Sequence, residues 1–337
     1  KPTRGQWPTT GPGGGCRPAR IDTMDLSHEI DVIRRAVRLA ARLCAAVASE
    51  SPTFPKPGGE PVTAADFGSQ AVLLEALATA FPRDAVRAEE SSADLVAAGA
   101  TALVTGAVGA ALERPVTAAE VAGWLDHRGG DSGRLWAVDP IDGTKGMLRG
   151  EQYAIAAGLI IDGAAVLGVL GCPRLELSGI HGVLVWGGPG IGAFVESLGE
   201  GKTRPLSVSA VADPARARIL GSVESAHGDP EFLRRIVDRL RIAGGWVRID
   251  SQAKYAAVAA GMADLYVRPR NRADWREMVW DHAAGAAIVA GAGGEVTDLD
   301  GRSLDFSTGD LLDGNRGVLA SNGALHAAVL AALAEMG

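Results

Sequence analysis

The feature that most constrains this chain is an apolar strand that runs directly into an acidic turn. Residues 136–146 read Trp-Ala-Val-Asp-Pro-Ile-Asp-Gly-Thr-Lys-Gly. The apolar residues predict a strand that delivers Asp139 to its end, and the proline and glycine predict a tight turn that brings Asp142 back beside it. Two carboxylates and the carbonyl of Ile141 are oxygen ligands of the kind that Mg²⁺ prefers. Asp, Pro and Gly are also common turn formers, so the spacing alone leaves a metal site and a plain surface turn both open.

Other acidic residues stand at the ends of predicted elements and are candidates for the same site. Glu89-Glu90 follows a short strand, while Asp66 and Asp281 each stand at the start of a helix. Taken singly, each aspartate is better explained as a helix cap, because carboxylates favour helix N-termini. The glutamates, taken alone, fit a solvated pair equally well.

Composition places the chain among globular proteins with one or two domains. Its 337 residues are 47% hydrophobic and 22% charged. Aromatic residues make up only 5% and glycines number 45, so the interior must consist mainly of Ala, Val, Leu and Ile. The net charge of -7 and the lack of a basic run argue against a nucleic-acid partner.

Cysteine content and hydropathy indicate which cellular compartment the chain suits. Cys16, Cys44 and Cys172 form no close pair, which argues against a disulfide scaffold and a zinc site and favours a reducing, cytoplasmic location. The uncharged stretch 95–112 is rich in Ala, Gly and Thr. It predicts a buried or half-buried helix in a surface lobe, not a membrane span.

Turn-rich segments divide the chain. Residues 1–24 are expected to be a tail or a presequence, which would direct the protein to a chloroplast or mitochondrion. Residues 25–205 form a first α+β half with an inserted lobe at about 91–133, and residues 206–337 form a second α/β half. The turn region 204–213 separates the halves.

Periodicity and turn signals predict a mixed α/β chain whose second half alternates between helix and strand. Helices are expected at 27–49, 66–80, 230–242, 251–261, 281–290 and 324–336, and strands at 86–90, 135–138, 153–161, 164–171, 219–223, 265–268, 295–299 and 318–321.

These segments together resemble the inositol-monophosphatase superfamily of lithium-sensitive metal phosphatases. Its signatures are an acid pair after a strand, a D-P-(I/L)-D-G-T turn and a W-D pair near a late helix. They match Glu89-Glu90, residues 139–144 and Trp280-Asp281, in that order, within a resemblance that runs from about residue 25 to the C-terminus. The segment 143–154 is similar to the 3′(2′),5′-bisphosphate nucleotidases of yeast and plants. Further segments similar to that branch are 62–70, 222–227, 250–255 and 264–268, whereas 269–276 is more basic than the family pattern.

The resemblance implies a layered αβαβα sandwich and an enzyme of sulfur metabolism. The expected reaction removes the 3′-phosphate of 3′-phosphoadenosine 5′-phosphate (PAP) by a metal-activated water. The sulfated nucleotide PAPS is a second candidate substrate, and a monomer without nucleic-acid or membrane partners is expected. By the same resemblance, two or three Mg²⁺ ions are held by Glu89, Asp139, Ile141, Asp142 and Asp281.

The remaining roles also follow from the resemblance. Asp66 and Thr144 orient the water and accept its proton. The substrate contacts are Thr144, His227, Ser251, Lys254, Arg268 and Asp281. Three of these residues also have explanations without a role in substrate binding: a surface histidine at 227, a helix cap at 251 and a charge at the rim of the site at 268.

Two rival functions remain. One is an inositol polyphosphate 1-phosphatase or inositol monophosphatase. The other is a non-catalytic nucleotide sensor, for which a lost metal ligand would be typical, whereas every expected ligand is present here.

Overall fold

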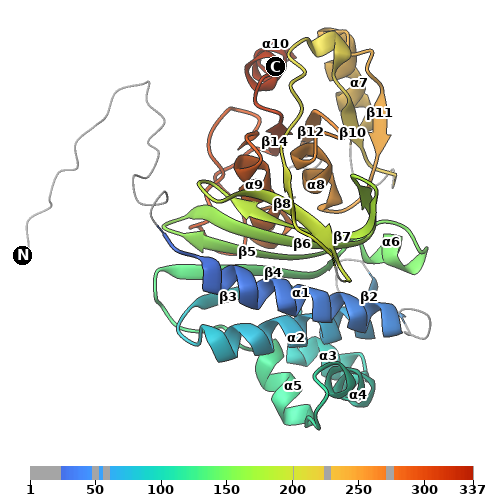
Figure 1. Cartoon of the computed structure of the whole chain (residues 1–337), viewed down its shortest axis with the longest axis vertical. Helices are drawn as coiled ribbons and strands as arrows, with labels where there is room; N and C mark the ends of the chain where they lie inside the picture. The colour runs from blue at the N-terminus through green and yellow to red at the C-terminus, as the bar shows by residue number, and fades with distance from the viewer. Residues whose placement is uncertain are drawn as a thin grey trace, which may run out of the picture.

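A seven-stranded sheet runs through the middle of the molecule in the computed structural model, which describes residues 24–47, 53–55, 61–199, 201–223, 229–270 and 277–336 (Figure 1). Its order is β3-β4-β5-β6-β7-β8-β9, and every pair except β3 with β4 is antiparallel. The strands are β3 (Ala85–Ala88), β4 (Arg134–Asp142), β5 (Ala154–Ile161), β6 (Ala164–Leu177), β7 (Ile180–Gly188), β8 (Gly192–Ser197) and β9 (Arg204–Leu206).

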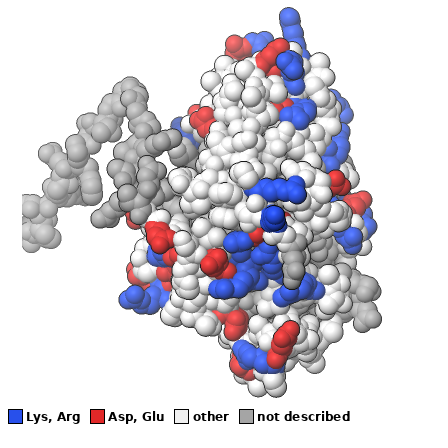
Figure 2. All heavy atoms as spheres, in the orientation of Figure 1, with Lys and Arg blue, Asp and Glu red and all other residues white. Residues whose placement is uncertain are grey.

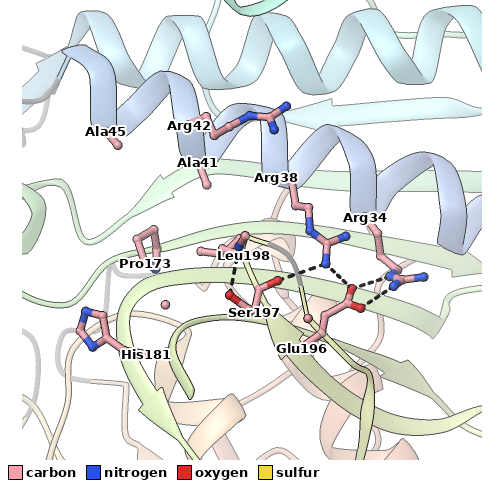
Figure 3. A pocket seen from close by; sticks show the side chains of 13 residues that line it. Arg34, Arg38, Ala41, Arg42, Ala45, Pro173, His181, Glu196, Ser197 and Leu198 are labelled. Atoms are coloured by element: carbon pink, nitrogen blue, oxygen red, sulfur yellow. Dashed lines mark hydrogen bonds and ion pairs between the residues drawn. The ribbon is translucent and has the colours of Figure 1, made fainter. Parts of the chain in front are cut away.

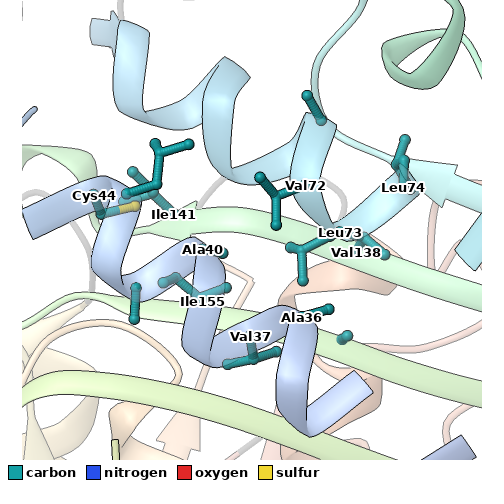
Figure 4. Close-up of a cluster of buried hydrophobic side chains, with 14 of the residues drawn as sticks. Ala36, Val37, Ala40, Cys44, Val72, Leu73, Leu74, Val138, Ile141 and Ile155 are labelled. Atoms are coloured by element: carbon teal, nitrogen blue, oxygen red, sulfur yellow. The ribbon is translucent and has the colours of Figure 1, made fainter. Parts of the chain in front are cut away.

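Two long helices, α1 (Ser27–Val47) and α2 (Ala64–Ala80), cover one face of this sheet (Figure 1). Figure 4 shows Val37 and Ala40 of α1 near Ile155 of β5, and Cys44 of α1 beside Ile141 of β4. Small residues such as Ala36 and Ala40 let the helices approach closely, as the alanine-rich composition predicts.

The opposite face of the sheet packs against α9 (Ala283–Gly291), which contacts β5, β6 and β7. The approach is close enough to require glycine at 168, because a Cβ atom there would lie 2.0 Å from the carbonyl oxygen of Ala284. The short helix α8 (Ala253–Ala259) lies beside α9 in the same layer. This contact matters for function because Asp281 lies two residues before α9.

A second sheet of five strands lies beyond α8 and α9, in the order β11-β10-β12-β14-β13. Its far face carries the apolar side chains of α7 (Pro230–Leu240) and α10 (His326–Met336). The layers therefore run helix, sheet, helix, sheet, helix, and the expected αβαβα sandwich is confirmed. The strands are β10 (Ile219–Gly221), β11 (Trp246–Arg248), β12 (Leu265–Arg268), β13 (Glu295–Thr297) and β14 (Val318–Ser321).

The remaining elements are short. The hairpin of β1 (Thr53–Pro55) and β2 (Pro61–Thr63) precedes α2, and α6 (Thr144–Leu148) follows β4. Helices α3 (Ser92–Ala97), α4 (Thr101–Ala111) and α5 (Ala118–Leu125) form the lobe between β3 and β4. The described helices include none with the length and apolar character needed to cross a membrane.

Several sequence expectations need correction. The stretch 95–112 is not one helix, because Gly99 takes a φ of 66° and separates α3 from α4. The turn expected at 204–213 contains β9, and β7 and β8 were not expected at all. The predicted tail 1–24, except for its last residue, and Cys16 lie outside the described residues.

Candidate active site

The acidic turn lies at the end of β4, where the pairing with β5 is irregular. Asp139 pairs with Ala156 and Asp142 with Ala154, so three steps along β4 match two along β5. Residues three apart in a regular strand point to opposite faces, and the extra residue of this bulge lets both aspartates face the same side. Gly143 then takes a φ of 90°, which glycine adopts without strain, and the chain enters α6.

Asp66 joins this turn to the start of α2. One carboxylate oxygen, Oδ2, accepts hydrogen bonds from the backbone nitrogen of Thr63 at 2.8 Å and from its hydroxyl at 2.7 Å. The other, Oδ1, lies 3.0 Å from the hydroxyl of Thr144, which is also 3.2 Å from the carbonyl oxygen of Ile141. Asp66 is thus part of a capping box and also reaches the predicted catalytic hydroxyl.

Parallel pairing of β3 with β4 carries Glu89 to the same edge of the sheet. The last residue of β3 stands opposite the residue before Asp139, so Glu89 leaves the sheet next to Asp139 of β4. Gln70 of α2 fixes this exit, because its amide donates to the carbonyl of Glu90 at 2.7 Å and accepts from the nitrogen of Glu90 at 2.8 Å.

Gln252 connects the acidic turn to the second half of the chain. Its backbone nitrogen donates to Oδ2 of Asp142 at 2.5 Å, and its side-chain nitrogen donates to the carbonyl of Trp280 at 3.0 Å. Asp281 is the next residue, at the end of a 3₁₀ turn before α9. One buried glutamine therefore holds the two acidic segments in a fixed relation.

The carboxylates are close enough to perturb one another. Burial raises the pKa of Asp139 well above its usual value, and the negative charges of Glu89, Asp142, Asp281 and Asp66 raise it further. Burial also raises the pKa of Asp66, to about 6, with a contribution from Glu89. The structure therefore brings the five predicted acidic residues to one place instead of scattering them.

Two cationic residues flank the acids. Burial lowers the pKa of Lys254 to about 8, although the charge of Asp142 acts in the opposite direction. Arg268 lies with Nε 2.9 Å from Glu277 and with a terminal nitrogen 3.7 Å from Asp281. Both predicted substrate-binding cations thus lie at the edge of the acidic group.

The other two predicted substrate contacts, Ser251 and His227, are not placed as expected or are not described. Ser251 does not begin the helix as expected, because it takes a φ of 63° and α8 starts two residues later. Its hydroxyl accepts a hydrogen bond from the nitrogen of Ala253 at 3.3 Å, although Gln252 is the N-cap residue of α8. The backbone nitrogen of Gln252, which precedes α8, donates to Asp142. His227 lies outside the described residues.

His282, which follows Asp281, is completely buried with both ring nitrogens engaged. It lies 2.7 Å from the hydroxyl of Tyr255 and 3.1 Å from Glu277. Possible ligand atoms of Glu277, Asp281 and His282 fall within 4.8 Å of one another. Arg268 already pairs with Glu277, so this grouping is a hydrogen-bonded support behind Asp281 rather than a metal site.

The predicted metal ligands fit Mg²⁺ by their chemistry. They offer carboxylate and carbonyl oxygens only, which suits a hard divalent cation. Buried carboxylates that raise one another's pKa are costly when ionised together, and a divalent cation offsets this cost.

Three supporting residues were missed at the sequence level: Gln70, Gln252 and Glu277. Gln70 and Gln252 lie inside the segments 62–70 and 250–255 that carry the resemblance, so the motifs contained the signal. Glu277 precedes Asp281 by four residues, and nothing in the sequence indicated its pairing with Arg268.

Comparison with known proteins identifies the family. The sequence model of the Inositol monophosphatase family matches residues 27–337. A rice protein named 3'(2'),5'-bisphosphate nucleotidase is 38% identical over 91% of this chain and 94% of its own length. A protein of the same name from Emericella nidulans is 35% identical over 93% of this chain and 99% of its own length.

Solved structures share the fold. An inositol monophosphatase from Thermotoga maritima superimposes with a TM-score of 0.65 at 23% identity, covering 91% of this chain and 97% of its own. The inositol monophosphatase from Anabaena gives a TM-score of 0.62 at 23% identity, covering 93% of this chain and 97% of its own. From the family match and these relatives, the chain belongs to the inositol monophosphatase family.

Proposed function

We propose that this protein is a Mg²⁺-dependent 3′(2′),5′-bisphosphate nucleotidase that releases the 3′-phosphate of PAP to give AMP and phosphate. Support for the substrate comes from the relatives that are 35% and 38% identical and carry this enzyme name. Support for the chemistry comes from one observation in the fold. Four acidic side chains from three segments, Glu89, Asp139, Asp142 and Asp281, gather at the end of β4 beside the Asp66–Thr144 pair.

Glu89, Asp139, Asp142 and Asp281, with the carbonyl of Ile141, are the proposed Mg²⁺ ligands. When bound, the metal neutralises phosphate oxygens and lowers the pKa of a nearby water. The chain prepares this site by fixing the ligands: the bulge aligns Asp139 with Asp142, and Gln252 holds Asp142.

Thr144 and Asp66 are the proposed proton acceptors. The Thr144 hydroxyl donates its hydrogen to Asp66, which leaves the hydroxyl oxygen free to accept a hydrogen bond from a water molecule. A hydroxyl alone is a weak base, and the carboxylate behind it draws the proton away from the water. Because the pKa of Asp66 is raised to about 6, it is a stronger base than an ordinary aspartate.

Lys254 and Arg268 are proposed to bind the phosphate that stays on the nucleotide. Both lie beside the acidic cluster and carry hydrogen-bond donors suited to a phosphate. A substrate with a second phosphate matches this arrangement. Inositol phosphates are the rival substrates, and the fold is compatible with them.

A side-by-side assay separates these substrates. Phosphate release is measured from PAP, PAPS, 5′-AMP and an inositol monophosphate, each with Mg²⁺ and with EDTA. PAP should give the highest kcat/KM of the four substrates, and EDTA should abolish turnover. An inositol phosphate that outperforms PAP would support the rival specificity, and turnover in EDTA would refute the metal requirement.

A further inference from the structure

A groove between α1 and the strands β7 and β8 shares no lining residue with the acidic cluster. It encloses about 860 Å³, within the size range of small-molecule pockets. Arg34, Arg38 and Arg42 line it from α1. They stand four residues apart, so the helix places them in a row on one side.

This row gives a protein of net charge -7 a local basic surface. Figure 2 shows Lys and Arg atoms gathered where α1 crosses this face of the molecule. No basic run marks the sequence, because the helix gathers residues that are separated along the chain. The groove is therefore suited to an anion although the whole protein is acidic.

The arginines are only partly neutralised. Figure 3 shows Arg34 and Arg38 pointing from α1 to Glu196 of β8. Arg34 donates to both carboxylate oxygens of Glu196, at 2.8 and 2.6 Å, and also lies 3.5 Å from the carboxylate of Asp31. Arg38 reaches Glu196 at 2.9 Å, and its buried Nε has no hydrogen-bond partner. Arg42 is exposed and pairs with no described acidic residue.

The charge balance indicates the ligand. Among the described lining residues, three carry a guanidinium group and one carries a carboxylate, so positive charge is in excess even with Asp31 beside Arg34. A phosphate monoester carries about −1.5 to −2 near neutral pH. Ala41, Ala45, Pro173 and Leu198 supply an apolar lining beside the arginines. A phosphate with a compact organic group would use both parts.

We infer that this groove binds a phosphate monoester dianion with an organic group the size of a nucleoside. Arg38 and Arg42 donate to the phosphate, and the apolar lining receives the organic part. Glu196 is the residue that holds Arg34 and Arg38 in place. This site is separate from the proposed catalytic site and does not depend on the reaction assigned there.

Calorimetric titration of the full chain with AMP in EDTA tests the assignment. Arg42→Ala removes a guanidinium without described contacts, and Ala45→Glu adds a negative charge at an exposed position. The matched control is Arg35→Ala, because Arg35 of the same helix lines a different groove between α1 and α2. Both groove variants should lose one AMP per chain, or bind it at least about tenfold more weakly, while the control matches wild type.

Titrations with inorganic phosphate and adenosine, and kinetics with PAP, complete the test. Inorganic phosphate and adenosine should each bind the groove more weakly than AMP, and kcat/KM for PAP should be unchanged in both groove variants. Equal AMP stoichiometry and affinity in all four proteins would overturn the inference. Inorganic phosphate binding as tightly as AMP would also overturn it, because the organic group would then be irrelevant.

Discussion

Asp66 serves two neighbours with its two carboxylate oxygens. Oδ2 closes the capping box of α2, while Oδ1 faces the hydroxyl of Thr144. The cap explanation from the sequence and the catalytic explanation therefore describe the same residue. A carboxylate held from one side by the helix start presents its other side in a fixed direction, which favours proton transfer.

Removing the Thr144 hydroxyl tests this pair. Thr144→Val keeps the shape of the side chain but leaves no group between water and Asp66, so kcat for PAP should fall by roughly 10²–10⁴-fold. Thr144→Ser restores the hydroxyl and should recover most of the activity. Steady-state kinetics at saturating Mg²⁺ provide the measurement, and a fully active valine variant would exclude the proposed role.

Gln252 is a positioning residue, since it joins Asp142 to the segment that carries Asp281. Gln252→Met retains the length of the side chain and loses the bond to the Trp280 carbonyl. Loss of such a supporting hydrogen bond is expected to weaken Mg²⁺ affinity by about 10–100-fold. Direct calorimetric titration with Mg²⁺ measures this without turnover.

A matched substitution controls for general effects of the change to methionine. Gln152→Met removes a hydrogen bond to the carbonyl of Arg174, and Gln152 has no proposed role in metal binding. It should leave Mg²⁺ affinity at the wild-type level. Equal affinity in both variants would show that Gln252 does not position the ligands.

At the scale of elements, sequence periodicity predicts the long helices well. α1, α2, α7 and α10 each begin or end within a few residues of the expected range. α1 and α7 bury one apolar side, whereas α2 is buried on all sides over its first eleven residues, 64–74. The strands β7 and β8 were missed because glycines interrupt them, and glycine weakens the strand signal. Gly291 of α9 packs directly on these strands, since a Cβ on Gly291 would lie 2.6 Å from the carbonyl oxygen of Gly192. Such a contact depends on tertiary packing and cannot be read from local sequence.

An ion pair holds β10 and β12 together in the second sheet. Asp264 is fully buried and accepts three hydrogen bonds from Arg218. Two come from the guanidinium group, at 2.9 and 3.0 Å, and one comes from the backbone nitrogen, at 2.6 Å. Asp264→Asn should lower the free energy of unfolding by about 2–3 kcal/mol, less than for a fully buried pair because Arg218 is 34% exposed. Urea unfolding measures this change.

The exposed pair of Asp300 with Arg316 is the control for that substitution. Asp300→Asn should cost less than about 1 kcal/mol, since surface ion pairs contribute little. Burial opposes ionisation of Asp264, but the hydrogen bonds from Arg218 and Ser209 outweigh it and hold the pKa below its usual value. The Asp264 contribution is therefore present above the unfolded-state pKa and lost as pH falls below about 4. Equal losses in the two variants at neutral pH would contradict this account.

At the scale of the whole molecule, the layers explain why the site forms. β4 supplies Asp139 and Asp142 from one sheet, while the turn before α9 in the middle layer supplies Asp281. Close packing of α9 on β5 and β6 fixes the distance between them. The sequence motifs predicted that these acids lie together, but the supports from Gln70, Gln252 and Glu277 depend on packing between distant segments.

The assembled cluster should link Mg²⁺ binding to proton release. Burial and mutual repulsion raise the pKa values of Asp139 and Asp281, and burial raises that of Asp66 to about 6. Groups that hold protons in the metal-free protein must lose them when the cation binds, so apparent Mg²⁺ affinity should increase from about pH 5 to about pH 8. Titrations in buffers of different ionisation enthalpy measure the protons released. A pH-independent affinity without proton release would be inconsistent with a carboxylate site.

Anomalous X-ray diffraction from crystals soaked in Mn²⁺, a stand-in for Mg²⁺, tests the central claim most directly. The account predicts at least two cation peaks bounded by Glu89, Asp139, Asp142, Asp281 and the Ile141 carbonyl, with oxygen distances of roughly 2.0–2.3 Å. Peaks confined to Glu277 and His282, or to the molecular surface, would contradict it.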